Sequence, residues 1–277
     1  KFKTMKNFLY SLTFILLATT VIKSNAQTTA WARANTLQKG VNMSGWLEAE
    51  WEMPLNYPDT FKYTKNHFIF LKNLGFKTIR FPVLFQILAD TFPPYTLQSS
   101  HITYSLVDSV ISWTQSIGLN LVIDNHPSDD NSTYFLTDAN YLTQLSRLCG
   151  VWKNLTQQYQ SLNPTTTFFE IRNEPTDAIS TANWRIVAEA IIDTIRNYDT
   201  EHTIITGAAY WNNGDSLYNL IPFADTNIIY TFHYYNPENF TAQGQDTTLP
   251  TGITFPLAGD VNNMRQDLIY VKNWSLI

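Results

Sequence analysis

Cysteine is almost absent from this sequence, since Cys149 is the only one among 277 residues. A single thiol cannot form an internal disulfide, and it cannot supply the several cysteines of a structural zinc site. The segment around Cys149 has the apolar spacing of an amphipathic helix. A free cysteine packs there as a small hydrophobic residue, so we expect Cys149 to be buried.

Basic residues are also scarce, with 18 Lys and Arg against 23 Asp and Glu. The first 26 residues carry four lysines and no acid, so the remainder has 14 basic and 23 acidic residues. A chain this acidic is not expected to bind nucleic acid or an anionic membrane surface. Its eight tryptophans supply flat faces on which a neutral sugar ring stacks, although a hydrophobic core uses the same side chains.

Three motifs of other enzyme classes are missing. No strand-like segment leads into a glycine-rich phosphate loop, which disfavours a nucleotide-binding sheet. No G-x-S-x-G occurs, which disfavours a serine hydrolase. The five histidines lack the spacing of H-E-x-x-H, so we expect no metal, and no other feature indicates a cofactor.

The N-terminus has the pattern of a secretory signal peptide. A basic start at Met5-Lys6 precedes the apolar run Phe8–Ile22, and Ser24-Asn25-Ala26 places small residues where a signal peptidase cleaves. We expect cleavage after Ala26, and a secreted or periplasmic protein that leaves the membrane after cleavage. The alternative is an N-terminal anchor, but the apolar run is shorter than the ~20 residues of a membrane span.

The remaining residues, 27–277, alternate between short β-rich runs and helical patterns. This alternation predicts βαβ units with a parallel sheet, and their spacing fits an α/β barrel of the (β/α)8 (TIM) type as one domain. Gly75 and Gly118 stand where a glycine ends a helix. The expected helices are Tyr63–Leu74, Ser105–Ile117, Asn140–Gln160 and Asn183–Asn197. The six expected strands are Lys39–Met43, Lys77–Val83, Asn120–His126, Thr167–Glu174, Thr203–Ala208 and Asn227–Tyr235.

Polar side chains lie at or near the carboxyl ends of these strands, where barrel enzymes carry their active sites. Glu174 ends the fourth strand, and Pro175 stops the strand after it. Cleavage of a glycosidic bond needs a protonated carboxyl beside the leaving oxygen, and burial or nearby negative charge can keep a Glu protonated near neutral pH. The residues at the strand ends are Arg80, Asp124, His126, Asn173, Glu174, His233 and Tyr235.

Five segments together resemble glycoside hydrolase family 5, the retaining barrel enzymes of the cellulase type. They are GVNMSGW, KTIRFPV, LVIDNHP, FFEIRNEP and YTFHYY, and they span Gly40 to Tyr235 in this order. Each segment alone is a weak signal, whereas the combination is specific. The resemblance implies a secreted hydrolase of a plant-type polysaccharide, with an endo-acting β-1,4-glucanase as the leading expectation.

The resemblance also implies roles for individual residues. Glu174 resembles the catalytic acid/base, and Asn173 the residue that binds the sugar 2-hydroxyl. Arg80 is similar to the arginine that keeps the nucleophile ionised, although an ion pair with Glu170 is the alternative. The remaining expectations are substrate binding by His126, orientation of the carboxylates by His233 and Tyr235, and our own assignment of Trp211 as a stacking platform. A purely structural His126 and a core position for Trp211 stay open.

The sequence departs from the family pattern after Tyr235. The family's nucleophile is a Glu that ends a seventh strand, whereas Glu238 is the only later Glu here and follows Pro237 in an expected loop. We expect about six of the eight barrel units, a domain incomplete at its C-terminus, and a chain that is poorly soluble and inactive by itself. The complete domain is expected to be a monomer that binds a polysaccharide or an oligosaccharide.

Other functions stay open at this stage. β-Mannan, xyloglucan and β-1,3-glucan are alternative substrates, because loops rather than the barrel set specificity. A carbohydrate-binding protein on a degenerate barrel would use the same cleft without a nucleophile. An esterase or an aldolase is disfavoured, because no serine motif is present and no lysine ends an expected strand.

Overall fold

The computed structural model describes residues 29–48, 62–90, 92–98, 100–127, 134–245 and 250–275. The expected signal peptide, residues 1–26, lies outside this part of the chain. Within the described ranges, no helix has the length and apolar character that a membrane crossing requires.

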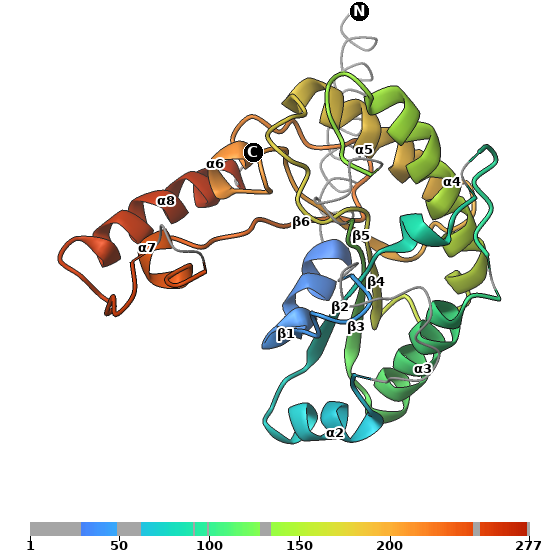
Figure 1. Cartoon of the computed structure of the whole chain (residues 1–277), viewed down its shortest axis with the longest axis horizontal. Helices are drawn as coiled ribbons and strands as arrows, with labels where there is room; N and C mark the ends of the chain where they lie inside the picture. The colour runs from blue at the N-terminus through green and yellow to red at the C-terminus, as the bar shows by residue number, and fades with distance from the viewer. Residues whose placement is uncertain are drawn as a thin grey trace, which may run out of the picture.

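The centre of the molecule is a parallel sheet of six strands in the order β1-β2-β3-β4-β5-β6 (Figure 1). All six predicted strands are present, and their parallel pairing confirms the barrel-type expectation. In the described part of the chain the sheet is open, because β1 and β6 each pair with one neighbour. The strands are β1 Gly40–Asn42, β2 Thr78–Val83, β3 Asn120–Asn125, β4 Thr167–Glu170, β5 Thr203–Thr206 and β6 Ile228–Tyr230.

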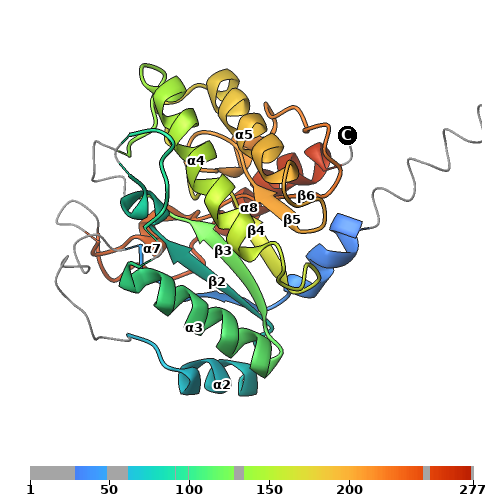
Figure 2. The ribbon, with the colours of Figure 1, turned by 90° about the vertical axis from the view of Figure 1, so that its right-hand side faces the viewer.

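Helices cover one face of this sheet, and α2 to α5 lie side by side along it in two views (Figures 1 and 2). The four predicted helices are confirmed within a few residues at each end, and Gly118 ends α3 with a left-handed φ of 74°. The longer helices are α2 Lys65–Asn73, α3 Ile102–Ile117, α4 Tyr141–Tyr159, α5 Thr181–Arg196 and α8 Asp260–Trp274. The short ones are η1 Asn35–Leu37, η2 Phe85–Leu88, α6 Gly214–Leu217 and α7 Glu238–Thr241.

Helix α5 illustrates how the sequence sets this packing. Ser180 precedes it in an extended conformation, and its hydroxyl accepts the Asn183 N–H, which satisfies one free donor of the first turn. The buried residues recur every three or four positions, so they form one stripe that faces the sheet. Full burial of each large apolar side chain contributes about 2 kcal/mol. The stripe consists of Trp184, Val187, Ala188, Ile191, Ile192 and Ile195.

Strand residues alternate between this helical side and the interior of the curved sheet. Ile79, Leu121 and Phe169 belong to the large core beneath the helices. Val122 and Phe168 form a small interior cluster with Ile205, packed against Leu37 and Ile229. The same alternation brings Arg80 beside Val122, and Asp124 beside Glu170, on the interior side. The charged residues of the strands therefore share one face.

Two segments outside the sheet fix its surroundings. Near the N-terminus, Arg33 donates to Thr203 Oγ1 at 2.9 Å, which places residues 29–38 at the amino ends of the strands. At the other end of the chain, α8 is anchored by Trp274, whose indole donates to Leu220 O at 2.9 Å. Cys149 is half-buried on α4, so the expectation of a buried thiol was only partly correct.

Candidate active site

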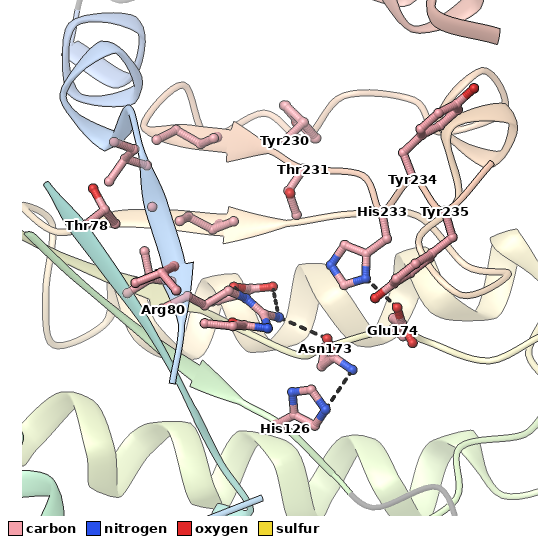
Figure 3. Close-up of a pocket in the computed structure, with 18 residues that line it drawn as sticks. Thr78, Arg80, His126, Asn173, Glu174, Tyr230, Thr231, His233, Tyr234 and Tyr235 are labelled. Carbon is pink, nitrogen blue, oxygen red and sulfur yellow. Dashed lines mark hydrogen bonds and ion pairs between the residues drawn. The ribbon is translucent and has the colours of Figure 1, made fainter. Parts of the chain in front are cut away.

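The predicted site residues meet in one cavity at the carboxyl ends of the strands (Figure 3). Its volume is about 610 Å³, and it opens to solvent. The interior strands supply its floor, and the segment after β6 supplies one wall. Among its lining residues are Arg80, His126, Asn173, Glu174, His233 and Tyr235.

Arg80 holds two buried carboxylates at the cavity floor. Its Nε and Nη2 donate to the two oxygens of Glu170, both at 2.7 Å, and Nη2 also lies 2.9 Å from Asp124 Oδ2. The pairing with Glu170, which the sequence left as the alternative for Arg80, is therefore present. Burial lowers the pKa of Arg80, but the charges of Asp124 and Glu170 outweigh it and raise the pKa, so the side chain is a cation.

The two carboxyl groups respond in opposite directions. Burial raises the pKa of Glu170, and the neighbouring Asp124 raises it further, against the opposing effect of Arg80. Burial also raises the pKa of Asp124, but Arg80 and His126 outweigh that effect, and the net shift is downward. Asp124 is thus the more strongly ionised member of the pair.

The amide of Asn173 is oriented from both sides. Arg80 Nη2 donates to Asn173 Oδ1 at 2.9 Å, which turns the amide nitrogen toward His126 Nε2 at 3.1 Å. An amide nitrogen only donates, so when His126 is neutral its Nε2 accepts this hydrogen bond and its proton is on Nδ1. That Nδ1 lies 2.8 Å from Asp124 Oδ2. Arg80, Asn173, His126 and Asp124 therefore form a closed ring of polar contacts.

Glu174 stands at the cavity mouth beside a histidine and a tyrosine. His233 Nδ1 hydrogen-bonds to Glu174 Oε1, and both side chains are about one-fifth exposed, at 18% and 20%. The Tyr235 hydroxyl points toward Glu174 (Figure 3). Burial raises the pKa of Tyr235, and the charge of Glu174 raises it further. The hydrogen bond from His233 therefore holds the Glu174 carboxyl group at the cavity mouth.

Glu174 lies in the irregular segment after β4, whereas the sequence predicted that it would end the strand. β4 ends at Glu170, and the next carbonyl, that of Ile171, accepts hydrogen bonds from side chains, namely Trp152 Nε1 at 2.8 Å and Asn125 Nδ2 at 3.3 Å. This segment carries Asn173 and Glu174 beyond the strand end. The expected convergence of these residues is nevertheless present.

Two residues singled out in the sequence do not line the cavity. Trp211 is one of them, and it is 39% exposed, so a fully buried core position is excluded. Tyr234 does line the cavity, although its hydroxyl donates to Asp267 of α8 at 2.8 Å. Glu238 begins the short helix α7, not the expected loop, and it does not line the cavity either. No strand follows β6 within the described ranges.

Two further polar residues of the site were not predicted from the sequence. Asn42 ends β1, and its Oδ1 accepts a hydrogen bond from Arg80 Nη1 at 3.2 Å. The strand-end rule that identified the other residues would have found it. Glu48 accepts the N–H groups of Gly45 and Trp46 in the loop after β1, and its charge raises the pKa of His126. No motif marks Glu48, because it follows no strand directly.

Groups of three or more His, Cys, Asp or Glu that could hold a metal ion do not occur in the part of the chain that the structure describes. Arg80, Asp124, His126 and Asn173 instead make polar contacts with one another. This arrangement suits proton transfer and hydrogen bonding to a hydroxyl-rich ligand.

A comparison with protein families identifies the chain. The family model described as Cellulase (glycosyl hydrolase family 5) matches residues 29–276. The chain belongs to glycosyl hydrolase family 5. This family has the (β/α)8 fold, of which the described part shows six parallel strands in one sheet. The resemblance in the five sequence segments is thereby confirmed.

Curated members of the family are similar over most of this chain and are longer. Endoglucanase 3 of Fibrobacter succinogenes is 35% identical over 224 residues, which are 76% of this chain and 33% of that protein. Endoglucanase C of Acetivibrio thermocellus is 26% identical over 214 residues, which are 75% of this chain and 60% of the relative. The chain therefore spans one third to three fifths of these two relatives.

Solved structures of the family agree with the fold. Cel5A of Thermotoga maritima, solved in complex with cellobiose, has a TM-score of 0.75 at 28% identity, with 89% of this chain and 77% of that chain covered. The same enzyme has been solved with mannotriose, at 27% identity, the same TM-score and the same coverage.

Proposed function

We propose that this protein is a secreted, endo-acting β-1,4-glucanase that works by double displacement with retention of configuration. The observation that carries the proposal is the hydrogen bond between Glu174 and His233 at the mouth of the cavity. It is supported by the endoglucanases among the relatives, because cleavage of a glycosidic bond needs a carboxyl group beside the leaving oxygen.

In the proposed mechanism Glu174 acts twice. It first gives its proton to the leaving glycosidic oxygen, and it then takes a proton from the water that attacks the glycosyl-enzyme intermediate. His233 and Tyr235 hold the carboxyl group in place. Asn173 offers its amide to the sugar 2-hydroxyl, because its orientation is already fixed by Arg80 and His126.

The nucleophile of this mechanism is a second carboxylate about 5 Å from the first. Glu170 lines the cavity, but both of its oxygens bind Arg80. We therefore assign the nucleophile to no described residue, and we propose that the 277-residue chain does not hydrolyse glucan by itself.

The substrate proposed is a β-1,4-linked glucan, a neutral polymer that suits an acidic chain. Trp211 is partly exposed and its N–H donates to Pro175 O, next to Glu174, so its ring is proposed as a platform on which one sugar ring stacks. β-Mannan is the next substrate to test, because Cel5A has been solved with mannotriose as well as cellobiose.

The test is hydrolysis of a soluble β-1,4-glucan by the product of the complete coding sequence, assayed beside the 277-residue chain. Glu174→Gln removes the transferable proton and should lower the rate by roughly 10²- to 10⁴-fold. Glu189→Gln, an exposed position on α5, is the matched control and should keep full activity. Activity that survives Glu174→Gln, or hydrolysis by the 277-residue chain, would contradict the corresponding part of the proposal.

A non-catalytic carbohydrate-binding protein is the second candidate. It is favoured by one observation, that no described residue provides a free second carboxylate in the cavity. Affinity electrophoresis distinguishes the two candidates. Retardation of the complete product in a glucan gel, without any released sugar, would support binding alone.

Secretion is proposed from the N-terminal pattern of residues 1–26. N-terminal sequencing of the protein recovered from the medium or the periplasm should begin at Gln27. A protein that retains Phe8–Ile22 and stays with the membrane fraction would show that this segment is an anchor.

A further inference from the structure

Three consecutive residues after β5 have a left-handed backbone. Tyr210, Trp211 and Asn212 have φ values of 59°, 60° and 58°. Asparagine tolerates this conformation better than most residues, whereas bulky tyrosine and tryptophan rarely adopt it. Three such residues in a row persist only where the surrounding contacts hold them, and strain of this kind concentrates at functional sites.

The contacts of this left-handed turn lead to both partners of the Glu174–His233 hydrogen bond. On one side, the Trp211 N–H donates to Pro175 O at 2.7 Å, and Pro175 directly follows Glu174. On the other side, the His233 N–H donates to Asn212 O at 2.7 Å. The turn therefore connects the backbones of two residues whose side chains meet in the cavity.

The side chain of Asn212 fixes the turn from inside. It is completely buried, and its Oδ1 accepts the Ala208 N–H at 3.0 Å. A Cβ atom on residue 207 would lie 1.5 Å from that oxygen, so the side chain fits only because residue 207 is glycine. The Asn212 Nδ2 finds no hydrogen-bond partner in the part of the chain that the structure describes. A buried polar group retained at this cost indicates a role beyond local stability.

We propose that Asn212 is a positioning residue whose side chain, wedged against Gly207, fixes the left-handed turn and thereby holds Glu174 and His233 in contact. Asn212 touches neither the reacting atoms nor the sugar. Its catalytic meaning rests on the proposed role of Glu174, but the contact that it controls can be measured without any hydrolysis.

The readout is the NMR signal of the proton shared by His233 and Glu174, recorded on the 277-residue chain with ¹⁵N-labelled histidine. Asn212→Gly tolerates the left-handed backbone and removes the side chain, so we expect the signal to disappear. Asn212→Asp keeps both an acceptor oxygen and a tolerance of positive φ, so it should retain the signal.

The neighbouring asparagine provides the matched control. Asn213 Oδ1 accepts the Asp215 N–H at 2.8 Å and caps α6. Asn213→Ala should lower the midpoint of urea unfolding and leave the signal unchanged. If Asn212→Gly behaves in the same way, Asn212 is merely structural and the proposal is overturned.

Gly207→Ala tests the packing of the Asn212 side chain against Gly207 from the opposite side, because the new methyl group displaces that side chain. The signal should be lost here too, and adding Gly207→Ala to Asn212→Gly should cause no further change.

If neither variant folds, hydrogen exchange of the backbone amides in the unsubstituted chain provides the test. The N–H groups of Trp211 and His233 should then be protected from exchange, and fast exchange of both overturns the proposal. Retained hydrolysis in Glu174→Gln would contradict the proposed function alone and leave this measurement intact.

Discussion

At the scale of single residues, the buried carboxylates of Glu170 and Asp124 share Arg80 as their positive partner. Arg80→Ala would leave Glu170 and Asp124, whose side chains are 3% and 0% exposed, without their positive partner. Removal of one partner from a buried ion pair costs about 3–5 kcal/mol. We expect the urea midpoint to fall accordingly. Arg265→Ala on exposed α8 is the control, and an equally small loss in both variants would contradict the prediction.

His126 makes the stability depend on pH in a defined direction. Burial lowers its pKa, but Asp124 raises it more, and the folded-state pKa lies above the ordinary 6.5. Such a group contributes stability that is complete below pH 6.5 and is lost as the pH rises through the folded-state pKa. Arg80 opposes this rise and Glu48 adds to it.

Urea unfolding of the chain and of His126→Gln over a series of pH values measures this effect. The difference in unfolding free energy between the two should be largest in the acidic range and should shrink as the pH increases. A difference that grows with pH would show that the imidazole is held neutral in the folded state.

Residue identity was predictable where the chemistry lies in or just after a strand. The sequence predicts that Arg80, Asn173, Glu174 and His233 converge, because parallel strands bring such positions together. Asn212 was not predictable, since a left-handed turn of three non-glycine residues has no sequence signature. The Asn212 side chain packs against Gly207, and this close approach of side chain and backbone exists only in the folded chain.

At the scale of elements, Gly118 sets the exit of α3. Its φ of 74° is strained for any residue with a Cβ atom, so Gly118→Ala should destabilise the chain by about 1 kcal/mol. Thermal unfolding followed by circular dichroism measures the loss. Ser116→Ala, two residues earlier and exposed, should leave the midpoint nearly unchanged. Similar midpoints for both variants would count against the strain argument.

Element type was easier to predict than element length. The periodicity of α5 and the run of β2 follow from the sequence, because one apolar stripe or one buried run is enough to identify each. The early end of β4 does not follow, because it depends on Trp152 and Asn125, which are distant in sequence from Ile171. When a side chain donates a hydrogen bond to a strand's carbonyl in place of the neighbouring strand, the strand ends although the local sequence does not indicate it.

At the scale of the whole molecule, the open sheet predicts self-association. β1 and β6 present unpaired edges within the described residues, and such edges pair with other chains. In analytical ultracentrifugation, the mass of the 277-residue chain should rise with concentration. Gly40→Lys places a charge on the exposed start of β1, where a Cβ atom makes only ordinary contacts, and should reduce this, whereas Ile186→Lys on exposed α5 should not. A constant monomer mass would contradict the prediction.

The opposite placement of the N-terminal segment and the cavity has a practical consequence. Residues 29–38 lie at the amino ends of the strands, whereas the Glu174–His233 pair lies at the carboxyl-end side of the cavity. Coupling the protein to a bead or a fibre through its first residues would therefore turn the cavity toward the surrounding solution. Immobilisation by this end would leave a long polymer free to enter from above.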